Sequence, residues 1–278
     1  MRRDMSLRFD LTRILVVLFC FLIALTVSGC KEPDSPDEIS FNGKRYKLTM
    51  SDDFDNWDSG KWEKCPQMER QDAGGRWSNS CSKVEEGNLV ISCSISKNGT
   101  PISGGVQTRS AYDQAFGLYH IRFKMEKADG LWYAFWLLSD AMDNDTTGGN
   151  GAVDGAELDI LEVVPHTGDF EMSVHWDGYY EHLKSYSEGI RVRNDFYDTY
   201  HEIWYLWDED GYSLYLDGTD EKSLVFSVSG KEHGDGTCAV PSYLIISAEF
   251  GTWGGEIDET QLPARFYVDY ARVYSPLT

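Results

Sequence analysis

The sequence predicts an all-β domain, a sandwich of antiparallel sheets, over residues 39–278. Short segments alternate apolar and polar residues with a period of two, which is typical of strands that bury one face. Gly, Asp and Asn residues separate these segments, and no long segment keeps the 3.6-residue period of a helix. Roughly 240 residues are enough for one large core, and the sequence contains no internal repeat that would indicate a second domain.

The expected strands follow one another along the chain. The segment 119–126 sets the pattern, because its Tyr, Ile, Phe and Met residues fall on one face and its charged residues mostly on the other. Further strands are expected at 130–136, 156–164, 171–176, 201–207, 212–216, 224–228, 243–250 and 265–274, with turns at 210–211, 217–218, 234–236 and 254–255. Residues 140–155 are rich in Asp, Gly, Asn and Thr and predict a loop that leads directly into the strand at 156–164.

The N-terminal residues predict an exported lipoprotein. Four Arg residues lie before or at the start of an apolar run at 14–27, which is too short to span a membrane and typical of a signal-peptide core. The run ends in Val-Ser-Gly-Cys at 27–30, which resembles the bacterial lipobox and predicts a signal peptide over residues 1–29 and a lipid on Cys30. The acidic stretch 30–38 would then be a tether, and its acidic residues resemble a signal for export to the outer surface of the outer membrane.

The net charge of the mature chain limits the classes of molecule that it is expected to bind. Removal of residues 1–29 takes away four Arg and two Asp and leaves 21 basic and 44 acidic residues, a formal charge of −23. This negative charge disfavours binding of nucleic acid and of heavily sulfated polymers, so a neutral glycan is the expected partner. The sequence gives no reason to expect an oligomer, so a monomer is expected. Four cysteines outside the signal and lipid positions allow three pairings, of which proximity favours Cys65 with Cys81; no spacing resembles a zinc site.

Three carboxylates lie within residues 157–162, interleaved with aliphatic residues. The aliphatic residues predict a buried strand on which Glu157 and Asp159 share a face that Glu162 should miss. A β-bulge near Leu161 would bring Glu162 back to that face. Because carboxylates in a row repel one another and are costly to desolvate, chemistry explains this pattern better than structure does. The alternative is an acidic edge strand that is merely solvated.

The chemistry that fits the three carboxylates is retaining hydrolysis of a glycosidic bond. Four pleat steps separate the backbones of Glu157 and Glu162 by roughly 13 Å, and side chains that lean inward would bring the carboxyl groups to about 5 Å, the separation found in retaining glycosidases. One carboxylate would attack the anomeric carbon while the other protonates the leaving oxygen. Asp159 would hydrogen-bond to the nucleophile and help to keep the acid protonated.

Aromatic residues near this strand predict a sugar-binding groove, because the C–H patches of sugar rings stack on indole faces. Trp132 and Trp136 share a face of the preceding strand, His175 and Trp176 lie in the following strand, and Trp253 lies in a Gly-rich loop. Each of these Trp residues could instead pack in the core. His175 could bind a sugar hydroxyl, assist the carboxylates, or be an ordinary hydrogen-bonded residue.

Together these segments resemble glycoside hydrolase family 16. Residues 157–162 are similar to the bulged form of its catalytic motif, Glu-x-Asp-x-x-Glu, and residues 130–136 are similar to its cleft strand. Residues 52–55 with 61–62, 116–119 and 266–274 resemble further strands of the family, in the same order. The resemblance implies a jelly-roll β-sandwich with a concave groove and endo-type hydrolysis.

By position, the resemblance makes Glu157 the nucleophile, Asp159 the assisting carboxylate and Glu162 the acid/base. It implies groove positions for Trp132 and Trp136. It requires no cofactor, although Asp269 matches a position that binds a structural calcium ion in some relatives or can cap a turn. Two further residues are candidates for the groove: Glu249, if its strand parity matches that of the family, and Arg109, which would contact a sugar or form a structural salt bridge.

The resemblance leaves the substrate open. A β-1,3 or mixed-linkage β-glucan is the first expectation, and an endo-β-galactosidase acting on galactose-containing host or algal glycans is the second. Many laminarin-cleaving relatives have Pro at the position of Tyr133 and a Trp-Pro sequence within residues 150–155, and this chain has neither. A non-catalytic glycan-binding surface protein is the alternative from another class, but it would not need the paired acid and nucleophile.

Overall fold

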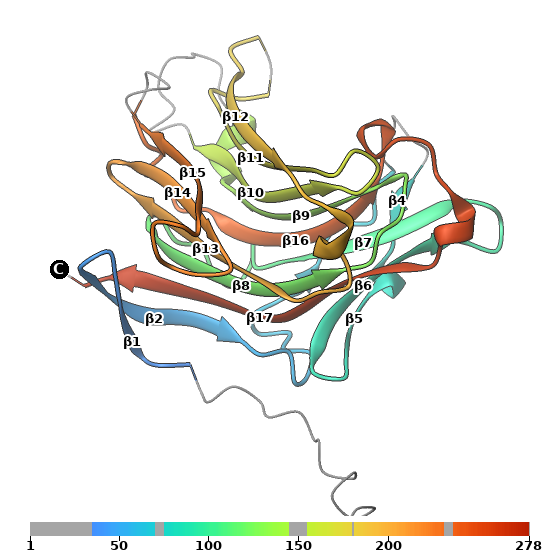
Figure 1. The fold of residues 1–278 in the computed structure, drawn as a ribbon, viewed down its shortest axis with the longest axis horizontal. Helices are drawn as coiled ribbons and strands as arrows, with labels where there is room; N and C mark the ends of the chain where they lie inside the picture. Colours follow the sequence, from blue (N-terminus) through green and yellow to red (C-terminus); the bar gives the residue numbers. More distant parts are fainter. Residues whose placement is uncertain (1–34, 70–74, 145–154, 180, 231–235, 278) are drawn as a thin grey trace, which may run out of the picture. The chain divides into compact units, whose positions relative to one another are not determined.

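Two antiparallel sheets packed face to face form the folded unit of residues Asp37–Thr278 (Figure 1). The computed structural model describes residues 35–69, 75–144, 155–179, 181–230 and 236–277. Residues 1–34 lie outside this set, so the predicted signal peptide, Cys30 and most of the tether are not described. Within the described ranges, no helix is long and apolar enough to cross a membrane.

The sheet that carries the three carboxylates is called the front sheet. Its strands are, in spatial order, β12 (Lys184–Arg191), β11 (Asp169–Trp176), β10 (Ala156–Val164), β9 (Leu131–Leu138), β16 (Tyr243–Phe250), β7 (Pro101–Gln107) and β3 (Glu63–Lys64). The short strand β4 (Arg76–Trp77) adds to β7 in the parallel sense. The acidic strand β10 is therefore flanked on both sides by paired strands and is not an edge strand.

The second sheet is called the back sheet. It runs β1 (Glu38–Phe41), β2 (Lys44–Asp52), β17 (Ala264–Pro276), β8 (Gly117–Met125), β13 (His201–Asp208), β14 (Gly211–Leu216) and β15 (Leu224–Ser229). The first half of β17 also pairs with β6 (Asn88–Ile95), which pairs in turn with β5 (Ser82–Glu85) and joins the front sheet through β7. Short 3₁₀ turns complete the fold: η1 (Asn79–Cys81), η2 (Asp140–Asn144), η3 (Asn194–Phe196), η4 (Thr252–Gly254) and η5 (Glu259–Gln261).

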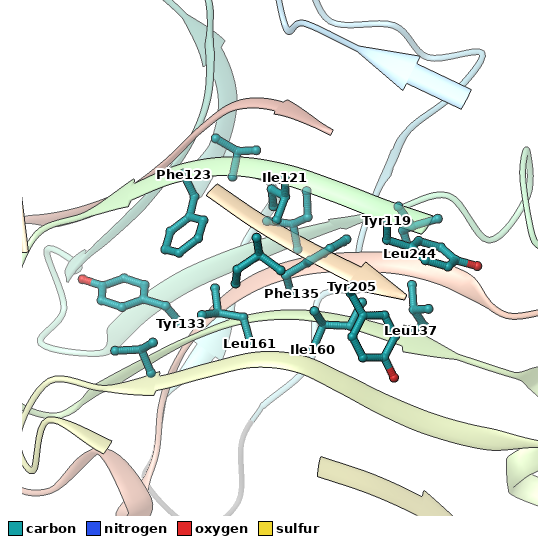
Figure 2. Close-up of a cluster of buried hydrophobic side chains, with 14 of the residues drawn as sticks. Tyr119, Ile121, Phe123, Tyr133, Phe135, Leu137, Ile160, Leu161, Tyr205 and Leu244 are labelled. Atoms are coloured by element: carbon teal, nitrogen blue, oxygen red, sulfur yellow. The ribbon is translucent and has the colours of Figure 1, made fainter. Parts of the chain in front are cut away.

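The core lies between the two sheets. Figure 2 shows side chains from β8, β9, β10, β13 and β16 that meet there: Tyr119, Ile121, Phe123, Tyr133, Phe135, Leu137, Ile160, Leu161, Tyr205 and Leu244. Burial of each large side chain stabilises the fold by about 1.5–3 kcal/mol, so the alternating pattern fixes which face of each strand points inward. The opposite face of the front sheet is left for polar and aromatic residues.

The all-β sandwich predicted from the sequence is confirmed, and each predicted strand is present. Strands β1, β5, β6 and β7 were not among those predicted, and neither was β12, whose residues Lys-Ser-Tyr-Ser-Glu-Gly-Ile-Arg lack an apolar alternation and are mostly exposed. Residues 140–144 of the predicted loop form η2, and residues 145–154 lie outside the described ranges.

The expectation of a disulfide between Cys65 and Cys81 is wrong. Both thiols are free and buried, as are those of Cys93 and Cys238. Cys65 packs beside Trp77 on the outer face of the front sheet, whereas Cys93 and Cys238 belong to the core between the sheets. The four residues therefore act as small apolar side chains.

Candidate active site

The strand β10 contains the β-bulge predicted from the sequence. On the β9 side, Asp159 pairs with Trp136 and Leu161 pairs with Phe135, so Ile160 is an additional residue. Ile160 and Leu161 are both fully buried in the core, although consecutive residues of a regular strand point to opposite faces. The bulge therefore returns Glu162 to the face of Glu157 and Asp159.

A pocket of about 340 Å³ opens on this face of the front sheet. Its lining combines carboxylates from β10 and β16 with aromatic residues from β9 and the segment after β11: Glu157, Asp159, Glu162, Glu249, Trp132, Ala134, Trp136 and Tyr179. Ala134 pairs with Glu162 in register, and its small side chain leaves space between the two Trp residues for that carboxylate. The pocket has the size and mixed character of a small-ligand site.

Crowding and burial shift the protonation of two of these carboxyl groups. Burial and the charges of Asp159 and Glu157 raise the pKa of Glu162 to about 9. Burial and the charges of Glu157 and Glu249 raise the pKa of Asp159 well above its usual range. Glu162 therefore holds a proton at neutral pH, as a general acid requires.

Hydrogen bonds connect the carboxylates to the neighbouring strands. The Tyr179 hydroxyl donates to Oε2 of Glu157. His175 pairs with Glu157 across the sheet, and its Nε2 lies 3.2 Å from Oδ2 of Asp159 while its Nδ1 lies 2.6 Å from Oγ of Ser185 on β12. The histidine thus links the assisting carboxylate to the edge of the sheet.

One group of residues has the spacing of metal ligands. A ligating atom from each of Glu157, Asp159 and His175 lies within 4.8 Å of the other two, and carboxylate and imidazole groups suit a divalent transition metal. All three residues already have protein partners, because Tyr179 bonds to Glu157 and His175 lies between Asp159 and Ser185. The same atoms are thus arranged as a hydrogen-bonded set for acid and nucleophilic chemistry.

The aromatic residues predicted for the groove lie beside the carboxylates. Trp136 donates its indole N–H to Oγ of Ser247, at 3.1 Å, and Trp132 packs against Trp253 with ring centroids 5.9 Å apart. A Cβ atom on Gly251 would lie 2.1 Å from the Trp132 ring, so only glycine permits this packing. Trp253 is 37% exposed and extends the aromatic surface away from the pocket.

Glu249 faces the pocket, as its parity predicted. It pairs with Trp132 across β16 and β9 and is 3% exposed. A fourth carboxylate at this position adds negative charge near Asp159 and contributes to the raised pKa of that residue.

Three residues that the sequence analysis named as site candidates, Trp176, Arg109 and Asp269, do not line the pocket. The groove role expected for Trp176 is wrong: the residue is 4% exposed in the core, because its neighbour His175 occupies the outer face. Arg109 does not line the pocket; it forms an ion pair with Asp140 at 2.7 Å and covers the ring of Tyr243, which fits the structural alternative.

Asp269, the position matched to a structural calcium ion, has a charged partner in the protein. It lies on β17 of the back sheet, and its Oδ2 is 2.5 Å from a guanidinium nitrogen of Arg122. Among the described residues, no group of three ligating side chains includes Asp269. The Arg122 guanidinium neutralises this carboxylate. The structural calcium ion at Asp269 stays a prediction.

Tyr179 is a site residue that the sequence analysis did not identify. The signal was present as Asp177-Gly178, a turn pair directly after the predicted strand 171–176. Strand alternation, on which the other candidates were chosen, cannot indicate where a side chain beyond a turn points.

Comparison with known proteins agrees with this geometry. The family profile "Glycosyl hydrolases family 16" matches residues 69–272. The chain is 28% identical over 284 residues to the beta-glucanase of Rhodothermus marinus, covering 91% of this chain and 93% of that protein. It is 27% identical over 186 residues to glucan endo-1,3-beta-glucosidase A1 of Niallia circulans, covering 62% of this chain but 26% of that protein.

The fold also has close counterparts among solved structures. The endo-beta-1,3-glucanase of Pyrococcus furiosus superposes with a TM-score of 0.71 at 22% identity, covering 88% of this chain and 100% of that one. At this identity the likeness concerns the jelly-roll-like sandwich alone, and it confirms the fold class that the sequence predicted. Because the family profile spans most of the chain, including β10 and its bulge, this protein belongs to glycoside hydrolase family 16 and is a glycosidase.

Proposed function

We propose that the protein is an endo-acting, retaining hydrolase that cleaves internal β-linkages of a β-1,3 or mixed-linkage β-glucan. The observation that carries this proposal is the bulge in β10, which places Glu157, Asp159 and Glu162 together in one tryptophan-lined pocket. The names of the two curated relatives favour a β-glucan as the substrate. The strongly acidic chain favours a neutral polymer of this kind.

The proposed reaction proceeds in two displacements. A Glu157 carboxylate oxygen attacks the anomeric carbon, while protonated Glu162 gives its proton to the departing glycosidic oxygen. The resulting glycosyl ester on Glu157 is then hydrolysed: Glu162, now a carboxylate, takes a proton from water, and the water oxygen displaces Glu157 from the anomeric carbon. Two inversions give net retention of the β configuration.

The other pocket residues have supporting roles in this proposal. Asp159, held by His175, places a buried acidic group between the two reacting carboxyls. Burial, more than the charge of any neighbour, keeps Glu162 protonated in the resting enzyme. Trp132 and Trp136 offer ring faces for sugar units next to the cleavage point, and Trp253 extends that surface. Glu249 would accept a hydrogen bond from a sugar hydroxyl.

The substrate assignment is tested by incubating the purified protein with laminarin, lichenan, barley glucan, agarose, keratan and mucin. Short oligosaccharides from one of the three glucans support the proposal. Products from agarose, keratan or mucin alone would replace the glucan by a galactose-containing glycan. Binding to these polymers without cleavage of any of them would contradict the enzymatic assignment and favour a glycan-binding protein.

The pH dependence should follow the raised pKa of Glu162. The general acid works only when protonated, so kcat/KM on laminarin should stay high through neutral pH and fall as the pH rises through about 9. A pH series of initial rates measures this directly. A fall that begins near the ordinary pKa of a glutamate, about 4.3, would contradict the role of a buried acid.

We also propose that the protein is a lipoprotein of the cell envelope, anchored at Cys30 and exposed on the outer membrane. The support is the signal-like sequence at 14–30, with its small residues before the cysteine. Replacement of Cys30 with Ala should move the protein from the membrane pellet to the soluble fraction, because lipid attachment requires the thiol. A Cys30→Ala variant that still sediments with membranes would disprove this anchor.

A further inference from the structure

The chain reverses direction immediately after β11. Asp177 and Gly178 both adopt left-handed backbone conformations, with φ of 64° and 76°. The buried Asp177 carboxylate lies 2.8 Å from Nζ of Lys184, the first residue of β12, which pairs with Trp176. This ion pair closes the base of the connection between β11 and β12 and fixes the turn from which Tyr179 emerges.

The turn brings Tyr179 to the front of the pocket. Its hydroxyl donates to Oε2 of Glu157, and its side chain lines the pocket together with the three carboxylates of β10. Tyr179 is 38% exposed, so burial of its ring does not explain where it lies. Its contact with Glu157 and the ion pair at the base of the turn place the side chain there.

We infer that Tyr179 is a positioning residue for the nucleophile: its hydroxyl holds the Glu157 carboxylate in the orientation from which it attacks the anomeric carbon, and the Asp177–Lys184 ion pair holds Tyr179 in place. This inference rests on the proposed function, which makes Glu157 the nucleophile. Tyr179 lies outside the Glu-x-Asp-x-x-Glu motif.

A hydrogen-bond donor to Glu157 matters because a second carboxyl group lies close to it. Glu157 and Asp159 have carboxylate oxygens within 4.8 Å of each other, and two ionised carboxylates at that distance repel. Burial and the charges of Glu157 and Glu249 raise the pKa of Asp159 well above its usual range. A phenol that donates to Glu157 restrains that carboxylate from rotating away.

Replacement of Tyr179 with Phe removes the hydroxyl and keeps the ring. We expect kcat to fall about 10- to 100-fold, the usual effect of losing a hydrogen bond to a charged group, while KM changes little. The fall should be similar on laminarin and on 2,4-dinitrophenyl β-laminaribioside, because Glu157 must attack in both cases. A variant of Glu162, in contrast, should spare the activated substrate.

Two further variants distinguish loss of the Tyr179–Glu157 contact from a general loss of structure. Tyr200→Phe makes the same chemical change just before β13, where the hydroxyl donates to Asn88 at 2.8 Å, and it should leave both rates unchanged. Lys184→Met breaks the ion pair with Asp177 and should reproduce part of the loss. Added to Tyr179→Phe, it should cause little further loss, because both changes release the same contact.

The outcomes are distinguishable. A wild-type protein that cleaves laminarin, together with a Tyr179→Phe variant of unchanged kcat, would overturn the positioning role and leave the proposed function intact. A rise in KM alone would also overturn it, because Tyr179 would then contact only the sugar. A wild-type protein that cleaves no glycan would overturn the proposed function and this inference with it.

Discussion

Replacing Glu157 with Gln should lower laminarin hydrolysis by roughly 10⁴- to 10⁶-fold, as loss of a nucleophile does in other covalent mechanisms. The amide cannot form the glycosyl ester, so the first displacement is lost. Binding should survive, because the Trp132 and Trp136 surfaces remain. Initial rates on laminarin and affinity electrophoresis in a laminarin gel measure the two effects separately.

The control for this variant is Glu188→Gln, the same change at an exposed position of the edge strand β12. It should keep the activity and the binding of the wild-type protein. Near-normal hydrolysis by Glu157→Gln would remove this residue from the role of nucleophile. Loss of binding together with activity would point instead to a damaged groove.

Replacing Glu162 with Gln should give a second pattern, which depends on the leaving group. Hydrolysis of laminarin should fall by roughly 10²- to 10⁴-fold, since an alkoxide leaving group needs a proton. The first step on 2,4-dinitrophenyl β-laminaribioside needs no such proton and should continue. Comparing the two substrates under the same conditions measures the difference, and equal losses on both would contradict the acid/base assignment.

Thermal unfolding of the Glu162→Gln variant shows whether its loss of activity comes from a loss of fold stability. The raised pKa means that folded Glu162 keeps a proton that the unfolded chain releases above about pH 4.3. The wild-type protein therefore loses stability from this residue as the pH rises from there to about 9. Gln removes that dependence, so the variant should be no less stable at neutral pH, and its advantage in thermal unfolding should grow with pH up to that value.

The parts of the fold that could be predicted are those in which side chains alternate in and out of one core. Every second residue of β8 and of β16 lies in the core between the sheets, and Trp132 and Trp136 lie on one face of β9 by the same rule. The bulge in β10 was predictable because three carboxylates on a strand make sense only if Glu162 returns to the face of the other two.

The remaining parts depend on tertiary contacts that sequence alternation does not encode. Trp176 is a different case: its aromatic character predicts the groove, but strand alternation puts it on the face opposite to His175, in the core. Tyr179 comes from a turn whose direction is fixed by the ion pair of Asp177 and Lys184, two residues seven positions apart that meet only when the hairpin forms.

The proposed reaction is a double displacement by the β10 carboxylates on an internal glucan linkage. Proton NMR of the anomeric region during the first minutes of laminarin hydrolysis by the intact protein distinguishes it from single displacement. Double displacement by an endo-acting enzyme predicts short oligosaccharides whose new reducing ends appear first as the β anomer and then mutarotate. New ends that appear first as the α anomer, or glucose as the only early product, would contradict it.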